Sequence, residues 1–437
     1  MARLSIRPVD ASLDQPVTIE VSDVSPGSRV RVRLRSDSLN AESSAEFVAN
    51  DQGVVDVAEH PAIAGDYEGI EPAGLFWSAR FDAGSDVVSM IETLSRLQPL
   101  AYTATVSVDG HDAGSTTFER QLLAANVVRT AVREGRIRGT LFASADATNA
   151  PGVVVLGGSD GGNLYEFVAA LLAAHGIAAL ALAYFAYDDL PKDLVGLSIE
   201  YFAEGVQWLR KRPEVGDARV GVLGFSRGGE AALIVGASFP QVAAVVALVA
   251  SGMSGGGLAG ADFSAMGKSA WTLGGQPLPL LPPPWDPVSM KEAQDAMSSG
   301  RAFAGRAGIL RAIKLAGARV DDVAIRVERT RGAILMMSGE DDQLWGSTEL
   351  TAIAEERLKA ATFAYPFEHR RYPGAGHFGC LPPNLPTTST SARHGLVPMA
   401  LEYGGDARNN ARASADLWPR IVTFLHQHLS TPNHFLP

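Results

Sequence analysis

Ser226 has the sequence surroundings of a nucleophilic serine. It lies in Gly224-Phe-Ser-Arg-Gly228, with the spacing Gly-x-Ser-x-Gly, after the apolar run Val220–Leu223 and before the helix-like stretch Glu230–Val235. Where a strand turns abruptly into a helix, a serine at the tip keeps its hydroxyl exposed, and the crowded turn requires glycine on both sides. The pattern predicts a serine that attacks an acyl carbon. The competing interpretation is a glycine-rich turn that happens to contain serine.

A serine hydroxyl needs a base to take its proton, and the base needs a carboxylate to orient it. His377 ends a loop of small residues that follows the strand-like segment Glu368–Tyr372, so its imidazole can reach across to a serine. Asp342 follows the apolar strand Ala333–Met337 in a Gly-x-x-Asp turn, which places it at the mouth of a sheet. Asp341 is the alternative, because adjacent side chains point to different sides. The order serine, aspartate, histidine is that of hydrolases built on an α/β sheet.

The remaining histidines and the single cysteine fit these roles less well. His369 and His394 stay candidates for the base, although neither has the strand–loop context of His377. Cys380 lies outside any turn that would expose a thiolate, so we expect a structural or incidental role for it. With one cysteine no intrachain disulfide can form, as expected in a reducing compartment.

A second glycine-rich turn, Leu156-Gly-Gly-Ser-Asp-Gly-Gly162, follows a predicted strand. The tetrahedral intermediate of acyl transfer carries a negative oxygen that backbone N–H groups stabilise. One donor is expected to be the N–H of Arg227, directly after the nucleophile, and the other to come from Ser159 or Gly158. A phosphate-binding loop is the competing interpretation, but the Gly-Lys-Ser/Thr ending of such loops is absent.

The elements that must position these residues form two regions. Residues 1–135 contain short segments of alternating polarity, such as Val30, Val32 and Leu34 between arginines, which predict an immunoglobulin-like β-sandwich. From 136 to 437 apolar runs alternate with helical stretches, which predicts a parallel sheet covered by helices on both faces. The fold class is therefore α/β, an α/β-hydrolase domain after the sandwich. Residues 252–301, rich in Gly, Pro and Ser, are expected to form a cap or lid, with a disordered insertion as the alternative.

Composition excludes several classes of protein. A chain of 437 residues exceeds one compact core, and a net charge of -11 argues against a nucleic-acid partner. The segment 167–187 is apolar enough to suggest a membrane span, but Gly176 divides it into a helical and a strand-like part. The N-terminus lacks the apolar core of a signal peptide, and the C-terminus carries no peroxisomal tripeptide. We expect a soluble, cytoplasmic protein.

Taken together, these motifs make the chain resemble the type I acyl-CoA thioesterases and bile acid-CoA:amino acid N-acyltransferases, as a bacterial-type member. The segments that carry the resemblance extend over nearly the whole chain: Gly69–Trp77, Arg138–Phe142, Ala183–Lys192, the Ser226 turn, Gly339–Trp345, Tyr372–His377 and Gly404–Arg408. The resemblance implies a β-sandwich on an α/β-hydrolase domain, with Ser226, Asp342 and His377 matching the family's catalytic triad.

Two departures from the family pattern bear on the substrate. The amino-acid-transferring members carry cysteine where this chain has Ser226. After His377 the family usually runs into a Pro-Pro-Tyr-like stretch, whereas this chain has Phe378-Gly-Cys-Leu-Pro-Pro-Asn384 and then a Thr/Ser-rich segment. We therefore expect a different rim of the acyl pocket.

The leading hypothesis is hydrolysis of an acyl thioester to free acid and thiol through an acyl-serine intermediate. The alternatives are an acyltransferase or cyclase, which passes the acyl group to an amine or alcohol, and a non-catalytic binding module. No metal or redox cofactor is expected, since the coenzyme A thioester is the substrate. The basic stretch Arg301–Arg331 is a candidate contact for the phosphates of coenzyme A or for an acidic acyl carrier protein, with a solvated helix face as the alternative.

Overall fold

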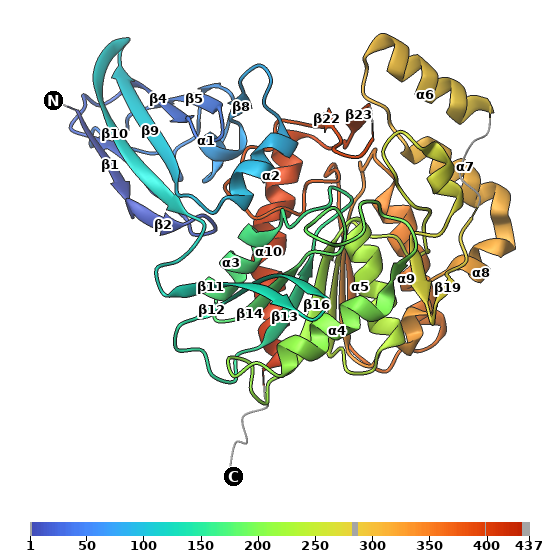
Figure 1. The fold of residues 1–437 in the computed structure, drawn as a ribbon. Helices are drawn as coiled ribbons and strands as arrows, with labels where there is room; N and C mark the ends of the chain where they lie inside the picture. The colour runs from blue at the N-terminus through green and yellow to red at the C-terminus, as the bar shows by residue number, and fades with distance from the viewer. Residues whose placement is uncertain (1, 282–286, 398, 431–437) are drawn as a thin grey trace.

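The structure, a computed structural model, describes residues 2–281, 287–397 and 399–430. Figure 1 shows a β-rich N-terminal part beside a larger part in which helices enclose a central sheet. Within the described ranges, none of the helices combines the length and apolar character that crossing a bilayer requires. The apolar stretch 167–187 contains most of one helix and a buried strand, with Gly176 at φ 78° between them, as the sequence predicts.

The N-terminal part is a β-sandwich because its strands bury every second side chain. In β4 (Arg29–Ser36), Val30, Val32 and Leu34 are buried between outward-facing arginines. The two sheets have the strand orders β1-β3-β6 and β2-β10-β9-β4-β5-β7, and β8 pairs with β5. Their other elements are β1 (Arg3–Arg7), β2 (Asp10–Ser12), β3 (Thr18–Ser22), β5 (Ala41–Val48), β6 (Val55–Asp56), β7 (Ala64–Gly65), β8 (Arg80–Phe81), β9 (Leu100–Val108) and β10 (His111–Gln121), with α1 (Gly74–Trp77) and α2 (Val87–Ser95).

The larger part is built on a sheet with the strand order β11-β12-β14-β13-β16-β17-β20-β21. From β14 to β21 the neighbouring strands run parallel, while β11, β12 and β14 pair antiparallel. The strands are β11 (Val127–Glu134), β12 (Ile137–Ser144), β13 (Gly152–Leu156), β14 (Ala178–Leu182), β16 (Val220–Phe225), β17 (Ala244–Leu248), β20 (Ala333–Gly339) and β21 (Phe367–Tyr372). The central strands are continuously apolar because helices cover both faces. This is the predicted α/β-hydrolase sheet.

Helices cover both faces of that sheet. Two of them, α3 (Glu166–Ala174) and α10 (Ala407–Leu429), pack on one face and share a continuous apolar core with the sandwich. The other three, α4 (Ile199–Arg210), α5 (Arg227–Ser238) and α9 (Ser347–Ala360), pack on the opposite face (Figure 1). Smaller elements lie outside these layers: β15 (Leu197–Ser198), β18 (Trp271–Leu273), β19 (Gln276–Pro277), α6 (Pro287–Ser299), α7 (Arg306–Ala316), α8 (Val320–Val323), β22 (Ser391–Arg393) and β23 (Ala400–Glu402).

The change from sandwich to α/β sheet comes earlier than the predicted boundary. The sandwich strands end with β10 at Gln121, and β11 pairs along its whole length with β12 in the eight-stranded sheet. The predicted division at residues 135 and 136 thus falls inside a β-hairpin. Strand β11 is largely exposed and mixes apolar and polar residues without strict alternation, so its sequence does not indicate which sheet it joins.

The sandwich supports the segment that connects β21 to α10. The backbone carbonyl of Trp77 accepts a hydrogen bond from the N–H of Thr387 (3.0 Å), and that of Ala79 accepts one from the Thr388 hydroxyl (2.7 Å). The N–H of Val87, at the start of α2, donates to Ser389 Oγ (3.3 Å). The path of residues 387–389 is therefore fixed partly by the N-terminal region, far away in the sequence.

Candidate active site

Ser226 lies at the tip of the sharp turn between β16 and α5. It has φ 53° and ψ −116°, a positive-φ conformation that residues other than glycine rarely adopt. Its N–H donates to the carbonyl of Leu248 on the neighbouring strand β17 (2.8 Å), which fixes the turn at the carboxyl edge of the sheet. The strand–turn–helix arrangement predicted from the sequence is confirmed.

The flanking glycines of this turn are required by close backbone approaches. A Cβ atom on Gly224 would lie 2.0 Å from the carbonyl oxygen of Gly228. A Cβ atom on Gly228 would lie 2.2 Å from the carbonyl oxygen of Gly157, in the second glycine-rich turn. Since both obstacles are backbone atoms, no rotamer change relieves them. The absence of side chains lets the two predicted turns pack directly on one another.

His377 and Asp342 form a buried hydrogen-bonded pair. His377 Nδ1 donates to Asp342 Oδ2 (2.8 Å), and Asp342 Oδ1 accepts from the N–H of Leu344 (3.0 Å). Asp342 is fully buried and His377 is 4% exposed. With the proton on Nδ1, Nε2 of His377 is left as the proton acceptor.

Asp341, the alternative carboxylate, is engaged elsewhere. Its Oδ1 accepts from the side-chain amide of Gln343 (2.6 Å), and its Oδ2 accepts from the N–H of Gly405 (3.1 Å). The geometry thus places Asp342, and not Asp341, against the imidazole.

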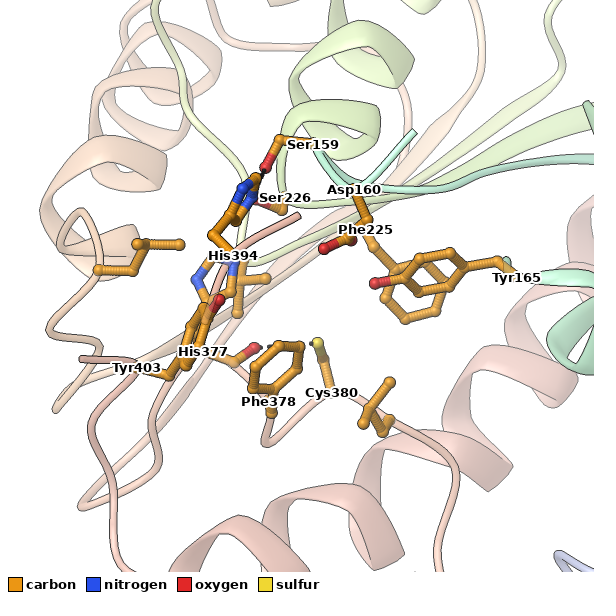
Figure 2. Close-up of a pocket in the computed structure, with 13 residues that line it drawn as sticks. Ser159, Asp160, Tyr165, Phe225, Ser226, His377, Phe378, Cys380, His394 and Tyr403 are labelled. Carbon is orange, nitrogen blue, oxygen red and sulfur yellow. Dashed lines mark hydrogen bonds between the residues drawn. The ribbon is translucent and has the colours of Figure 1, made fainter. Parts of the chain in front are cut away.

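Ser226 and His377 line the same cavity, shown in Figure 2. The cavity is narrow and partly open to solvent, and only about 20 Å³ of it is free for a water-sized sphere. The lining residues come from both glycine-rich turns, from the ends of β17 and β20, and from the segment between β21 and α10: Ser159, Asp160, Tyr165, Phe225, Ser226, Val249, Leu344, His377, Phe378, Cys380, Leu381, His394 and Tyr403. The arrangement brings a hydroxyl, an imidazole with a free acceptor nitrogen, and apolar walls to one place.

The predicted oxyanion donors lie beside Ser226. Arg227 is the first residue of α5, so its N–H has no acceptor within the helix. Ser159 lines the cavity, and Gly158 is close enough to the nucleophile that a Cβ on it would lie 3.5 Å from Ser226 Cβ. The hydroxyl of Tyr184 lies 2.8 Å from the carbonyl oxygen of Gly157 and 2.7 Å from that of Gly158, so its single proton is shared between them and helps to hold the loop. The geometry is compatible with an oxyanion site formed by Arg227 and Ser159 or Gly158.

A buried ion pair supports the start of α5. Arg227 Nη1 lies 2.6 Å from Glu230 Oε2, while Glu230 Oε1 accepts from Trp271 Nε1 (2.6 Å) and from the N–H of Gly255 (2.8 Å). Burial raises the pKa of Glu230, and the Arg227 charge and these two donors oppose that rise. Trp271, in β18, and Gly255 both belong to the predicted cap segment. That segment therefore contacts the helix behind the nucleophile.

Replacing Glu230 with glutamine is expected to destabilise the protein by about 3 kcal/mol, because it leaves the Arg227 guanidinium buried without a counter-charge. Chemical denaturation would measure the loss. The matched control is Glu204→Gln, which breaks an exposed ion pair with Arg136 and should cost less than about 1 kcal/mol. Equal losses for the two variants would contradict a structural role for the buried pair.

His394, one of the alternative bases, lines the cavity although no strand–loop context marks it in the sequence. Its Nε2 lies 2.9 Å from Ser159 Oγ, and its Nδ1 accepts from the N–H of Leu396 (3.0 Å). The proton is therefore on Nε2, which donates to Ser159 and leaves the Ser159 hydroxyl proton free for another acceptor. Burial lowers the pKa of His394, as does His377, while Asp160 opposes the shift. His394 is thus held as a neutral donor behind the second glycine-rich turn.

Asp160, Tyr403 and Cys380 also line the cavity without having been singled out for it. Asp160 follows Ser159 directly, so its place in the second glycine-rich turn was the available signal. Burial raises the pKa of Cys380, whose Sγ lies 3.3 Å from the carbonyl of His377, so the thiol is neutral. A nucleophilic role for Cys380 is not supported, although the residue faces the cavity.

His369, the other alternative base, belongs to a second hydrogen-bonded chain outside the cavity. Its Nε2 lies 2.8 Å from Ser338 Oγ, and its Nδ1 lies 2.8 Å from Glu355 Oε2. The order serine, histidine, acid is the same as in the candidate site. However, Ser338 and the His369 side chain are both 0% exposed, and neither lines the cavity. A substrate has no access to this group, so a structural role follows.

The predicted cap and basic stretch lie apart from the cavity. Among the described lining residues, none comes from 252–301, whereas five come from residues 378–403 of the connection between β21 and α10: Phe378, Cys380, Leu381, His394 and Tyr403. The part 282–286 of the predicted cap lies outside the described residues. In the basic stretch, Arg306 pairs with Glu349, Arg311 with Glu292 (2.7 Å) and Arg326 with Asp321 (3.4 Å). Three of its cations are thus paired within the chain, and a contact with coenzyme A phosphates stays a prediction.

Two family models match the chain. Residues 14–134 match the acyl-CoA thioester hydrolase/BAAT N-terminal region, and residues 197–431 match the BAAT/acyl-CoA thioester hydrolase C-terminal region. The two matches together contain the sandwich strands from β3 to β10, the nucleophile turn and the Asp342–His377 pair.

Similar proteins include full-length relatives. The chain is 32% identical to the peroxisomal succinyl-coenzyme A thioesterase of Mus musculus, over 98% of this chain and 97% of that protein. It is 33% identical to the mitochondrial acyl-coenzyme A thioesterase 2 of Homo sapiens, over 97% of this chain and 83% of that protein. A solved α/β hydrolase, GrgF from Penicillium, superposes with a TM-score of 0.39 at 13% identity, covering 70% of this chain and 99% of that one. The chain belongs to the acyl-CoA thioester hydrolase/BAAT family.

Proposed function

We propose that the protein hydrolyses acyl-CoA thioesters with Ser226 as the nucleophile. The observation that carries the proposal is the buried hydrogen bond between Asp342 and His377 Nδ1, which leaves His377 Nε2 as a proton acceptor. His377 lines the same cavity as Ser226. Membership of the family supports the thioester as the bond that is cleaved, since the named relatives are acyl-CoA thioesterases. No metal or redox cofactor enters this chemistry.

In the proposed reaction, Ser226 Oγ attacks the thioester carbonyl while His377 Nε2 takes the hydroxyl proton. The carbonyl oxygen becomes negative and is stabilised by the N–H groups of Arg227 and of Ser159 or Gly158. The C–S bond then breaks, and His377 returns the proton to the departing coenzyme A thiolate. Water next attacks the acyl-serine ester with His377 as base, which releases the acid and restores Ser226. Asp342 holds the imidazole in this tautomer and stabilises its charged form throughout.

The nature of the nucleophile favours water as the final acceptor. An oxygen ester reacts with amines less readily than a thioester does, so an acyl-serine persists until water reaches it. Transfer of the acyl group to an amine or alcohol is the alternative reaction of the same intermediate.

The proposal is tested by supplying acyl-CoA esters with and without glycine and taurine and identifying the products by mass spectrometry. We expect free acid and free thiol in equal amounts, and a Ser226 peptide heavier by the acyl group after rapid quenching. A product that contains the acceptor would favour the acyltransferase. Turnover without any acyl-Ser226 would overturn the mechanism.

Two further properties are predictions: the thiol that carries the acyl group, and the cellular location of the protein. We propose coenzyme A as the carrier, with an acyl carrier protein as the alternative, and a comparison of kcat/KM for the two thioesters would separate them. A cytoplasmic location stays a prediction as well, since the two relatives are named as peroxisomal and mitochondrial. Cell fractionation would test it.

A further inference from the structure

The cavity contains one carboxylate that the proposed hydrolysis does not use. Asp160 is half-buried, and Figure 2 shows its carboxylate pointing into the cavity, toward the hydroxyl end of Tyr165. In the part of the chain that the structure describes, this carboxylate has no recorded ion pair or hydrogen bond, and no lysine or arginine lines the cavity. Partial burial of a carboxylate without a partner is costly. A cationic or hydrogen-donating ligand group would offset that cost.

Aromatic rings form the walls around this carboxylate. The rings of Tyr165 and Phe225 have centroids 4.7 Å apart, and those of Phe378 and Tyr403 are 4.5 Å apart. Aromatic faces attract cations through the negative charge of their π-systems, and most strongly where water is excluded. The Tyr403 hydroxyl is buried and has no hydrogen-bond partner in the described structure. The combination of one carboxylate with aromatic faces is suited to an ammonium group.

The titratable side chains that face Asp160 are neutral, so they do not compete with an ammonium group for its carboxylate. Burial raises the pKa of Tyr165 and of Tyr403, and the Asp160 charge raises both further, so both phenols are neutral donors. His394 is neutral, as described above. No neighbouring cation on these elements therefore competes for the carboxylate.

The carboxylate lies near the nucleophile. The position that a Cβ on Gly158 would occupy is 3.3 Å from Asp160 Oδ2 and 3.5 Å from Ser226 Cβ. A group bound by Asp160 is therefore only a few bonds away from a carbonyl that Ser226 attacks. This closeness requires a short acyl chain.

We propose that Asp160, together with Tyr165 and Phe225, forms a subsite for an ammonium group, so that the preferred substrates are short acyl thioesters that carry an amine. The inference rests on the proposed function, because it places the acyl group in the cavity beside Ser226. The same chemistry would also recognise the ammonium of an amino-acid acceptor. An acyl chain that ends in a carboxylate would meet like charge and bind less well.

The test compares two isosteric substrates, 3-aminopropanoyl-CoA and butanoyl-CoA, which differ by an ammonium in place of a methyl group. We expect the wild-type kcat/KM to favour the ammonium substrate by about tenfold to a hundredfold, the range for a charge-assisted hydrogen bond. Asp160→Asn should remove this preference and Asp160→Glu should retain part of it. The readout is a ratio of two substrates, so a general loss of activity leaves it unaffected. The control Asp189→Asn, whose carboxylate pairs with Arg138 at the surface, should keep the wild-type ratio.

Failure of this inference differs from failure of the proposed function. If butanoyl-CoA is hydrolysed through Ser226 but the ratio is the same in wild type and Asp160→Asn, the subsite does not exist. If neither thioester is hydrolysed, calorimetry with S-(4-aminobutyl)-CoA and S-pentyl-CoA still measures the subsite. Tighter binding of the amine that Asp160→Asn abolishes would support it, and equal binding would overturn it. Preferred transfer to an added amino acid, lost in Asp160→Asn, would assign the ammonium to the acceptor.

Discussion

Replacing Ser226 with alanine is expected to lower kcat for an acyl-CoA substrate by about a millionfold. Without the hydroxyl no acyl-enzyme forms, and His377 has no proton to take from the nucleophile. The residual rate would come from water held near the N–H groups of Arg227 and Ser159. Thiol released from the acyl-CoA, followed with a colorimetric thiol reagent, measures the loss.

Ser338→Ala is the matched control for this substitution. Ser338 Oγ lies 2.8 Å from Nε2 of His369, and Nδ1 of that histidine lies 2.8 Å from Glu355 Oε2. It differs in being fully buried away from the cavity. We expect Ser338→Ala to lower stability without reducing kcat of the folded enzyme. Equal thiol release by wild type and Ser226→Ala would reject the serine mechanism.

Ser226, Asp342 and His377 could be selected from the sequence because local signals mark each of them. The glycines around Ser226 are required because a Cβ on Gly224 would lie 2.0 Å from a backbone oxygen, so the turn leaves a fixed pattern in the chain. Asp342 follows the buried strand β20 and His377 follows the partly exposed strand β21, and parallel strands end at one edge of the sheet. A short pattern next to an apolar run is enough to predict this part of the site.

The rest of the cavity depends on contacts between distant segments. His394 lies in a Thr/Ser-rich stretch without periodic pattern, and its position follows from hydrogen bonds between residues 387–389 and the sandwich. Composition suggested a cap at 252–301, but loop composition does not define which face a loop covers. Similarly, the mixed polarity of β11 is compatible with either sheet, and only its pairing with β12 assigns it to the eight-stranded one. The position of His394, the face that residues 252–301 contact and the sheet that β11 joins all depend on tertiary packing, which cannot be predicted from the pattern of a single sequence.

Asp342→Asn is expected to lower kcat by about ten-thousandfold while leaving the protein folded. The amide places an N–H donor where the carboxylate accepted from His377 Nδ1. The imidazole then shifts its proton to Nε2, the nitrogen that has to receive the proton of Ser226. The substitution also removes the negative charge of Asp342, which stabilises the imidazolium that forms during the attack. Steady-state thiol release gives kcat, and thermal unfolding checks the fold.

Asp341→Asn separates this effect from a general disturbance of the turn. The two acids are adjacent in the chain, but Asp341 accepts from Gln343 and from the N–H of Gly405, and it does not contact the imidazole. An asparagine retains one acceptor oxygen there, so turnover should stay within a few-fold of wild type. If Asp341→Asn were the more damaging substitution, the orienting carboxylate would be Asp341, and the hydrogen bond between Asp342 and His377 would have no catalytic part. A large loss in Asp342→Asn alone would assign that role to the acid that contacts His377.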